Sequence, residues 1–210
     1  MDGNLRWSKI NNLNINQTYK IGIENLLKLS KFLFEKHNVE CVSAFALSTH
    51  NLLRSKTVIR SIFNILEEYL DEFIVNSNNY DFRVFFIGEF SIFNEDVRSK
   101  ILKINNLKNK HNKTLIIALN YSGRDDLNQA SINVLKNEKN TIGKYLSTSK
   151  FSDPDALIRT GGYNRLSDFF LYQCSFTELY FTKTLWPDLN KTYLNRIINK
   201  FSKLERKFGK

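Results

Sequence analysis

Cysteine, long apolar runs and internal repeats are scarce or absent in this sequence. The two cysteines, Cys41 and Cys174, both have apolar neighbours and lack the spacing of metal ligands, so we expect reduced core residues and no zinc site. No stretch is long and apolar enough to span a bilayer, and no leader of basic, then apolar, then small residues is present. Because no linker divides the chain either, we expect one cytoplasmic domain covering residues 1–210.

Negative charge is in deficit, with 21 acidic residues against 31 Lys and Arg, a net charge of +10. This excess implies an acidic partner, which could be nucleic acid, an anionic membrane surface or a phosphorylated small molecule. Nucleic acid is disfavoured because no recognised binding motif accompanies the charge, and much of the excess is diffuse lysine that biased composition explains equally well. Residues 191–210 are basic with apolar residues at helical spacing, which indicates an amphipathic helix and leaves membrane-surface association open.

Strand-like and helix-like segments alternate along the chain. Apolar periodicity predicts helices over 21–34, from 58 to 73 and from 126 onward, and strands over 39–47, 83–87, 115–119, 156–158 and 178–181. This order predicts an α/β fold, with a central, mostly parallel sheet flanked by helices on both faces. Polar clusters follow the strands, so we expect them to gather along one edge of the sheet.

The segment 153–167 combines the residue types that bind a diphosphate. Arg159 and Arg165 can each grip a phosphate bidentately, and Gly161 and Gly162 let backbone N–H groups come close to it. Ser167 can cap the following helix and also donate to the ligand. Two surface arginines on a glycine turn explain this segment, taken alone, equally well.

A second phosphate-binding pattern opens the chain. Asp2, Gly3, Asn4 and Arg6 suit a loop that enters a helix, whose N-terminus attracts anions. A carboxylate beside a diphosphate indicates a shared divalent cation, because two anions do not otherwise lie together.

Taken together, these segments resemble the cis-prenyltransferase family, whose best-known member is undecaprenyl diphosphate synthase. The similarity runs through nearly the whole chain in the family's order. The matching motifs are Asp2-Gly3-Asn4-x-Arg6-Trp7, Phe45-Ala46-x-Ser48-Thr49-x-Asn51-x-x-Arg54, Arg83-x-x-Phe86-Ile87-Gly88, Asn120-Tyr121-x-Gly123-Arg124, Ile158-Arg159-Thr160-Gly161-Gly162, Arg165-x-Ser167, Glu178-Leu179-Tyr180-Phe181 and Leu185-Trp186-Pro187-Asp188.

The resemblance implies a Mg²⁺-dependent homodimer that condenses isopentenyl diphosphate with an allylic prenyl diphosphate. It implies metal binding by Asp2 and by Glu178 of the opposite subunit, and catalytic roles for Asp2, Asn4 and Asn51. It also implies a hydrocarbon tunnel walled by the apolar faces of 21–34 and 58–74, for which core packing is the alternative. The substrate-binding residues that it implies are Gly3, Asn4, Leu5, Arg6, Trp7, Tyr19, Ser48, Arg54, Arg159, Arg165, Ser167 and, in the tail, Arg206 and Gly209.

Departures from the family pattern cluster on the allylic side. A glycine is replaced by Leu5 and a histidine by Tyr19, while an arginine appears as Ile15. His50 and Leu52 replace an acidic residue and a tryptophan, and Tyr163 replaces a glutamate; His50 could be an acid–base group, although a lone loop histidine is more often just polar.

An eroded allylic site leaves alternatives to regular chain elongation. Short products, irregular coupling of two allylic diphosphates, and an accessory subunit of poor activity all stay open. Retention of Asp2, Arg6, Arg159, Arg165 and Glu178 argues against the accessory subunit, since a scaffold need not keep them. Relatives also have an apolar strand before the Met-Asp-Gly-Asn motif. Either the start of this sequence is misassigned or trimmed, or the sheet lacks a central strand, and in the second case we expect the Asp2 loop to be poorly anchored.

Overall fold

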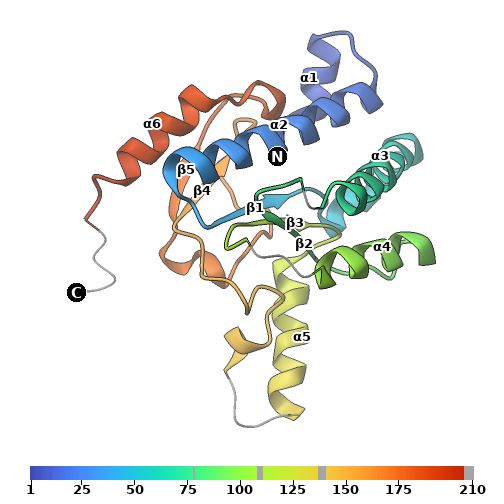
Figure 1. Ribbon diagram of the computed structural model, residues 1–210, viewed down its shortest axis with the longest axis vertical. Coiled ribbons are helices and arrows are strands. Elements are labelled where there is room, and N and C mark those ends of the chain that lie inside the picture. Colours follow the sequence, from blue (N-terminus) through green and yellow to red (C-terminus); the bar gives the residue numbers. More distant parts are fainter. Residues whose placement is uncertain (78, 108–110, 137–140, 206–210) are drawn as a thin grey trace.

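The computed structural model describes residues 1–77, 79–107, 111–136 and 141–205, which form parallel β-sheets with surrounding helices (Figure 1). The expected tail residues Arg206 and Gly209 lie outside the described residues. The longer elements are α1 (Asn4–Ile10), α2 (Ile15–His37), β1 (Cys41–Phe45), α3 (Lys56–Val75), β2 (Arg83–Ile87), α4 (Glu95–Asn106), β3 (Thr114–Ala118), α5 (Gly123–Lys136), β4 (Ala156–Arg159), β5 (Glu178–Phe181) and α6 (Lys191–Phe201). Short 3₁₀ helices are η1 (Thr49–Leu53), η2 (Ile142–Lys144), η3 (Gln173–Phe176) and η4 (Trp186–Asp188).

Within the described residues, the strands form two parallel sheets. The larger has the order β1-β3-β2, with Cys41 and Arg83 both opposite Thr114, and the smaller pairs β4 with β5, with Ala156 opposite Glu178. Parallel strands of one sheet need crossover connections, which α3 supplies from β1 to β2 at the other edge and α4 from β2 to the central β3. The predicted class, a mostly parallel sheet flanked by helices, is confirmed.

One face of the larger sheet packs against α2, α3 and α4. Strand residues Leu115 and Ile117 of β3 lie in one buried cluster with Leu29 of α2, Leu70 of α3 and Ile101 of α4. Leu70, Ile101 and Leu115 are completely inaccessible to solvent. These helices therefore fix the larger sheet, and with it the loops that follow the carboxyl ends of its strands.

Aromatic side chains cover the opposite face. Ile116 and Ile87 contact a cluster that includes Phe169 and Phe170, whose rings stack with centroids 4.0 Å apart. Phe45 at the end of β1 stacks on Phe169 at 4.7 Å. Since Phe169 lies only two residues after Ser167, sheet packing holds the end of the predicted diphosphate clamp in place.

Side-chain caps explain where two helices begin. Helix α2 begins at Ile15, before the predicted Ile21, because Asn14 and Gln17 form a reciprocal capping box; it ends where Asn38 adopts a left-handed conformation, with φ of 49°. Helix α5 begins at Gly123, before the predicted Asp126, where the Ser122 hydroxyl accepts from an amide of the first turn. Local hydrogen bonds thus extend both helices beyond the apolar periodicity.

Candidate active site

The loop around Asp2 is anchored to the end of β4. The Asp2 amide donates to the Thr160 hydroxyl at 2.9 Å, and that hydroxyl donates back to the Asp2 carbonyl at 3.0 Å. The amide of Trp186 donates to the same carbonyl, and its indole N–H donates to Gly22. Thr160, directly after β4, and Trp186, in η4, thus anchor the loop, so the poor anchoring expected if the preceding strand were lacking is not observed.

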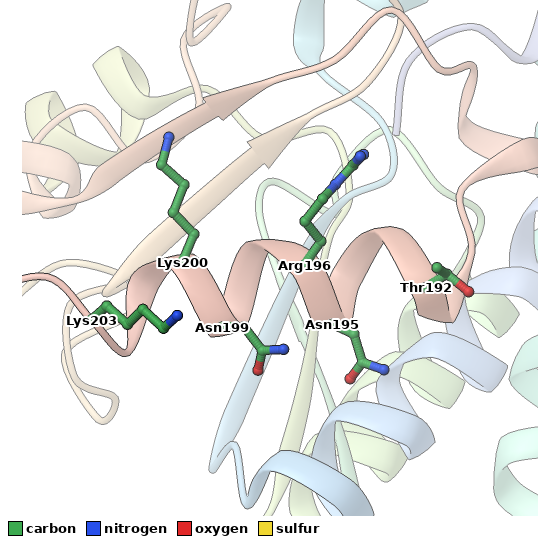
Figure 2. A pocket seen from close by; sticks show the side chains of 6 residues that line it. All are labelled: Thr192, Asn195, Arg196, Asn199, Lys200 and Lys203. Carbon is green, nitrogen blue, oxygen red and sulfur yellow. The ribbon is translucent and has the colours of Figure 1, made fainter.

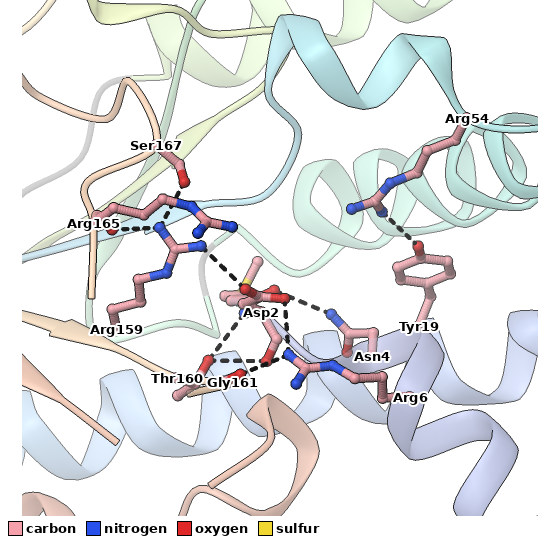
Figure 3. Close-up of polar contacts among 11 residues, drawn as sticks. Asp2, Asn4, Arg6, Tyr19, Arg54, Arg159, Thr160, Gly161, Arg165 and Ser167 are labelled. Carbon is pink, nitrogen blue, oxygen red and sulfur yellow. Dashed lines mark hydrogen bonds and ion pairs between the residues drawn. The ribbon is translucent and has the colours of Figure 1, made fainter. Parts of the chain in front are cut away.

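Gly161 allows Arg6 and Asp2 to come close to the loop that follows β4. The Arg6 guanidinium donates to the Gly161 carbonyl at 2.7 Å, and Gly161 has φ of 87° (Figure 3). A Cβ atom at Gly161 would lie 2.7 Å from the Arg6 guanidinium and 3.0 Å from the Asp2 carboxyl carbon. A side chain there would displace the Arg6 guanidinium and crowd Asp2, and the positive φ independently favours glycine.

Arg159 links the two predicted phosphate-binding segments. Its guanidinium donates to the Arg165 carbonyl, to the Ser167 hydroxyl at 2.6 Å and to the Asp2 carboxylate at 3.2 Å (Figure 3). The Arg159 side chain is only 14% exposed, and its Nε is buried without a partner among the described residues. The structure therefore brings Asp2, Arg159 and Ser167 together.

The Asp2 carboxylate lies between two guanidiniums. One oxygen is 3.5 Å from Arg6 and the other is 3.2 Å from Arg159. Asp2 thus balances positive charge that a diphosphate would otherwise balance. Because hydrogen bonds between ionised groups are strong, an incoming anion must compete with Asp2 for both arginines.

Arg165 is placed differently from Arg159. Its guanidinium lies 4.3 Å from the centre of the Tyr163 ring, over the ring face, and no carboxylate among the described residues pairs with it. Its N–H donors are therefore available to a ligand.

The predicted allylic side has fewer contacts. Arg54 is exposed, and its guanidinium donates to the Tyr19 hydroxyl at 3.3 Å (Figure 3). Burial raises the pKa of Tyr19, while the neighbouring Arg54 charge partly lowers it, so the hydroxyl stays protonated near neutral pH. His50 is exposed and Leu52 packs against the core.

Several predicted site residues have structural contacts that the sequence did not reveal. Ser48 and Asn51 form a reciprocal cap on η1, so these side chains stabilise the conformation of their own loop. Trp7 donates from its indole to Asp188 at 2.7 Å, which ties α1 to η4. Gly3 caps α1 with φ of 106° and packs against Leu185, so it fits a tight turn.

Asn4 and Leu5 lie in the first turn of α1. The Asn4 side chain donates to the Met1 carbonyl, while its amide oxygen is buried without a partner among the described residues. Leu5 is half-buried on this helix. Neither residue lines the cavity described next.

A cavity of about 1200 Å³ opens beside these groups. Its polar mouth includes Asp2, Arg54, Arg159, Arg165 and Tyr163. Apolar side chains from α2, β1, β4 and α6 form another part of its wall. The apolar lining residues include Leu26, Leu29, Leu33, Phe45, Leu157, Leu194 and Ile197.

The cavity differs from the predicted tunnel in one wall. Helix α2 contributes as expected, but none of the lining residues comes from α3. The apolar face of α3, including Ile65, Leu66 and Leu70, is buried in the core, so the core-packing alternative holds for it.

Acidic side chains are too dispersed to form a metal site on their own. Among the described residues, no three His, Cys, Asp or Glu side chains gather. Glu178 begins β5 opposite Ala156, whereas Asp2 contacts Arg159 at the other end of β4. Asp2 and Glu178 are therefore not brought together within one chain.

Comparison with known proteins identifies the family. Residues 1–209 match the prenyltransferase family model described as undecaprenyl diphosphate synthase. The chain belongs to this family. An isoprenyl transferase from Helicobacter pylori is 36% identical over 223 residues, spanning all of this chain and 94% of that protein.

Solved structures agree with this membership. A probable undecaprenyl diphosphate synthase from Campylobacter jejuni is 34% identical, with a TM-score of 0.81 over 91% of this chain and 93% of that one. Lavandulyl diphosphate synthase from Lavandula x intermedia, solved with dimethylallyl diphosphate, is 26% identical, with a TM-score of 0.90 over 100% of this chain and 95% of that one. The chain is thus an enzyme that transfers prenyl groups, and the family evidence supports cis-prenyl chain elongation over the alternative couplings or an accessory role.

Sequence reasoning missed the roles of two residues in the clamp itself. Thr160 is 2% exposed and anchors Asp2, and Tyr163 contacts three guanidiniums. Both residues lie in the segment 153–167, so their closeness in sequence to Arg159 could have indicated that they belong to the site. The contacts of Thr160 with Asp2 and of Tyr163 with Arg6 join residues more than 150 positions apart in sequence.

Proposed function

We propose that isopentenyl diphosphate binds at Arg159, Arg165 and Ser167, and that the allylic diphosphate binds beside Asp2 and Arg6. The observation that carries this proposal is the Asp2 carboxylate held between Arg6 and Arg159, next to the free guanidinium of Arg165. Three cations around one carboxylate leave positive charge in excess. Two diphosphates would supply the negative charge that this arrangement lacks.

The cavity suits the remainder of such substrates. Its mouth is charged and another part of its wall carries leucine side chains from α2, so an amphiphile with an anionic head and an apolar chain matches both parts. The prenyl chain would lie along Leu26, Leu29 and Leu33, with its diphosphate near Asp2.

The chain's own residues would stabilise charge on the departing diphosphate. In the condensation the allylic C–O bond breaks, a C–C bond forms to the isopentenyl carbon, and a proton is lost from the isopentenyl unit. Negative charge develops on the leaving oxygen, where the Arg6 guanidinium is positioned to stabilise it. Arg159 and Arg165 would hold the second substrate close, which removes much of the entropic cost of bringing two reactants together.

Mg²⁺ fits this site in the company of a substrate. A single carboxylate, Asp2, is available and two guanidiniums already contact it, which is a poor site for a bare cation. Mg²⁺ often binds through one or two carboxylates together with phosphate oxygens and waters, so Asp2 would hold it once a diphosphate is present. The bound ion would offset charge on the leaving group.

We propose a homodimer in which Glu178 serves the neighbouring active site. Support comes from the position of Glu178 away from Asp2 within one chain and from its partly exposed place on β5. We propose that Arg206 and Gly209 bind the same phosphates. That residues 1–210 form one catalytic domain stays a prediction.

We also propose contact with an anionic membrane surface through α6. This helix buries Leu194 and Ile197 against its own domain and directs basic residues outward. A hollow along it is lined by Thr192, Asn195, Arg196, Asn199, Lys200 and Lys203 (Figure 2). No helix among the described residues meets the length and hydropathy needed to cross a membrane. Co-sedimentation with anionic and neutral vesicles tests the proposal: equal binding to both would contradict it.

The enzymatic proposal is tested by product analysis with each component left out in turn. The purified protein is incubated with Mg²⁺, labelled isopentenyl diphosphate and allylic diphosphates of increasing length. We expect label in a longer prenyl diphosphate only when both substrates and Mg²⁺ are present. Label incorporation that is indifferent to the allylic diphosphate would overturn the proposal.

A further inference from the structure

The ring of Tyr163 lies among three guanidiniums of the candidate site. Its centroid is 4.3 Å from Arg165, 5.3 Å from Arg6 and 5.8 Å from Arg159. An aromatic face carries negative potential and attracts cations within about 6 Å. One side chain therefore contacts three cations of the candidate site, of which Arg159 and Arg165 also line the cavity.

Arg165 depends on this ring more than its two neighbours do. Arg6 and Arg159 each have the Asp2 carboxylate and further hydrogen bonds, from Arg6 to Gly161 and from Arg159 to Ser167. The Arg165 guanidinium has no such carboxylate among the described residues, and its contact is with the Tyr163 ring. Without the ring, the charges of Arg6 and Arg159 would push this flexible side chain outward.

An aromatic ring orients a guanidinium without occupying its N–H donors. A carboxylate at position 163 would attract Arg165 as well, but it would bind the donors that a phosphate needs and would have to be displaced. The Arg165 Cζ lies over the ring face at 4.3 Å, a contact that uses none of the five N–H donors of the guanidinium.

We infer that Tyr163 is a positioning residue that orients Arg165 toward the diphosphate of isopentenyl diphosphate. The inference rests on the proposed function of this site and adds a residue to it. Tyr163 is 43% exposed, so the ring contributes through its face and its position, not through burial in a core.

The test uses substitutions that distinguish the effect of the aromatic face from the effects of side-chain volume and of the hydroxyl group. Tyr163→Leu removes the aromatic face and keeps an apolar side chain, whereas Tyr163→Phe keeps the face. Tyr172→Leu is the matched control, because Tyr172 is also 43% exposed and lies beside Gly143. KM for each substrate, kcat and the melting temperature are measured for all variants.

We expect Tyr163→Leu to raise KM for isopentenyl diphosphate about 3- to 10-fold, as the loss of cation–π contacts at a partly exposed site predicts. KM for the allylic substrate, kcat and the melting temperature should change by much less. Tyr163→Phe and Tyr172→Leu should resemble the unmodified protein. In an Arg165→Ala background, Tyr163→Leu should have little further effect, since residues that act through one another are not additive.

Three results would overturn the inference. These are an unchanged isopentenyl KM in Tyr163→Leu, equal losses in the Phe and Leu variants, or full additivity with Arg165→Ala. If the unmodified protein neither binds isopentenyl diphosphate nor incorporates it, the proposed function fails and this inference fails with it. That pattern is distinct, because no variant would then differ from the unmodified protein.

Discussion

The two sides of the candidate site are held in place to very different degrees. On the clamp side, Arg159 is 14% exposed and its guanidinium has three acceptors, in Arg165, Ser167 and Asp2. On the other side, Arg54 is exposed and reaches the Tyr19 hydroxyl at 3.3 Å. The clamp is therefore organised before a substrate arrives, whereas Arg54 must be ordered by the substrate.

This difference has an energetic consequence. Ordering a long side chain on binding costs roughly 0.5–1.5 kcal/mol. On the clamp side the Arg159 side chain is already ordered in the folded protein, so this cost does not arise on binding. Substitutions on the clamp side should therefore have large effects, and substitutions at Arg54 or Tyr19 should have small ones. Most departures from the family pattern, such as Tyr19, fall on the loosely held side, whereas Tyr163 lies in the clamp and contacts its guanidiniums.

The largest effect is expected at Asp2, where the two sides meet. Asp2→Asn keeps the volume and removes the charge that Arg6 and Arg159 contact. Loss of leaving-group stabilisation should lower kcat by about a thousandfold, corresponding to roughly 4 kcal/mol. The exposed Asp125 on α5 provides the control, and Asp125→Asn should retain full turnover. Near-normal turnover of Asp2→Asn would refute the role of Asp2.

The second largest effect is expected at the two arginines of the clamp. Arg159→Ala and Arg165→Ala each remove charge-assisted contacts worth roughly 1.5–3 kcal/mol, so KM for isopentenyl diphosphate should rise about 10- to 100-fold. Arg159→Ala should have the larger effect because Arg159 also contacts Asp2. Equal increases in KM for both substrates would show that the two sites are assigned wrongly.

A smaller effect is expected on the loosely held side. Tyr19→Phe removes the acceptor for Arg54 and leaves the ring in place. An exposed hydrogen bond of 3.3 Å contributes little, so KM for the allylic substrate should rise by less than about fivefold. A loss as large as that of Arg159→Ala would end the distinction between the two sides.

The smallest effect concerns the apolar wall that both sides share. Cys41 of β1 lines the cavity, and burial raises the pKa of its thiol to about 11 from an ordinary value of 9.0. The unfolded chain loses this proton at lower pH than the folded one, so stability should fall as pH rises from about 9 to 11. Melting temperatures of Cys41→Ala should show a shallower decline over this interval. An identical decline in both proteins would indicate that water reaches the thiol freely.

The sequence predicted the clamp better than it predicted the contacts that hold it. Arg159, Arg165 and Ser167 lie within nine residues, so their convergence follows from a single loop after one strand. The anchoring of Asp2 by Thr160 joins residues 158 apart, which only the folded chain brings together.

Local side-chain bonding explains the other differences from the sequence predictions. Ser48 and Asn51, at a spacing of three residues, form a reciprocal cap that was not predicted from the sequence, while both also line the cavity, and their predicted roles toward the substrate stay predictions. The apolar periodicity of α3 could not distinguish a tunnel wall from a core face, because both need the same residues.

The most direct test is a crystal structure with Mg²⁺, isopentenyl diphosphate and an unreactive allylic diphosphate analogue. We predict that the isopentenyl diphosphate contacts Arg159, Arg165 and Ser167, that the allylic diphosphate lies beside Arg6, and that the pair between Asp2 and Arg159 opens to admit them. An unchanged pair between Asp2 and Arg159, with the isopentenyl diphosphate bound elsewhere, would contradict the account.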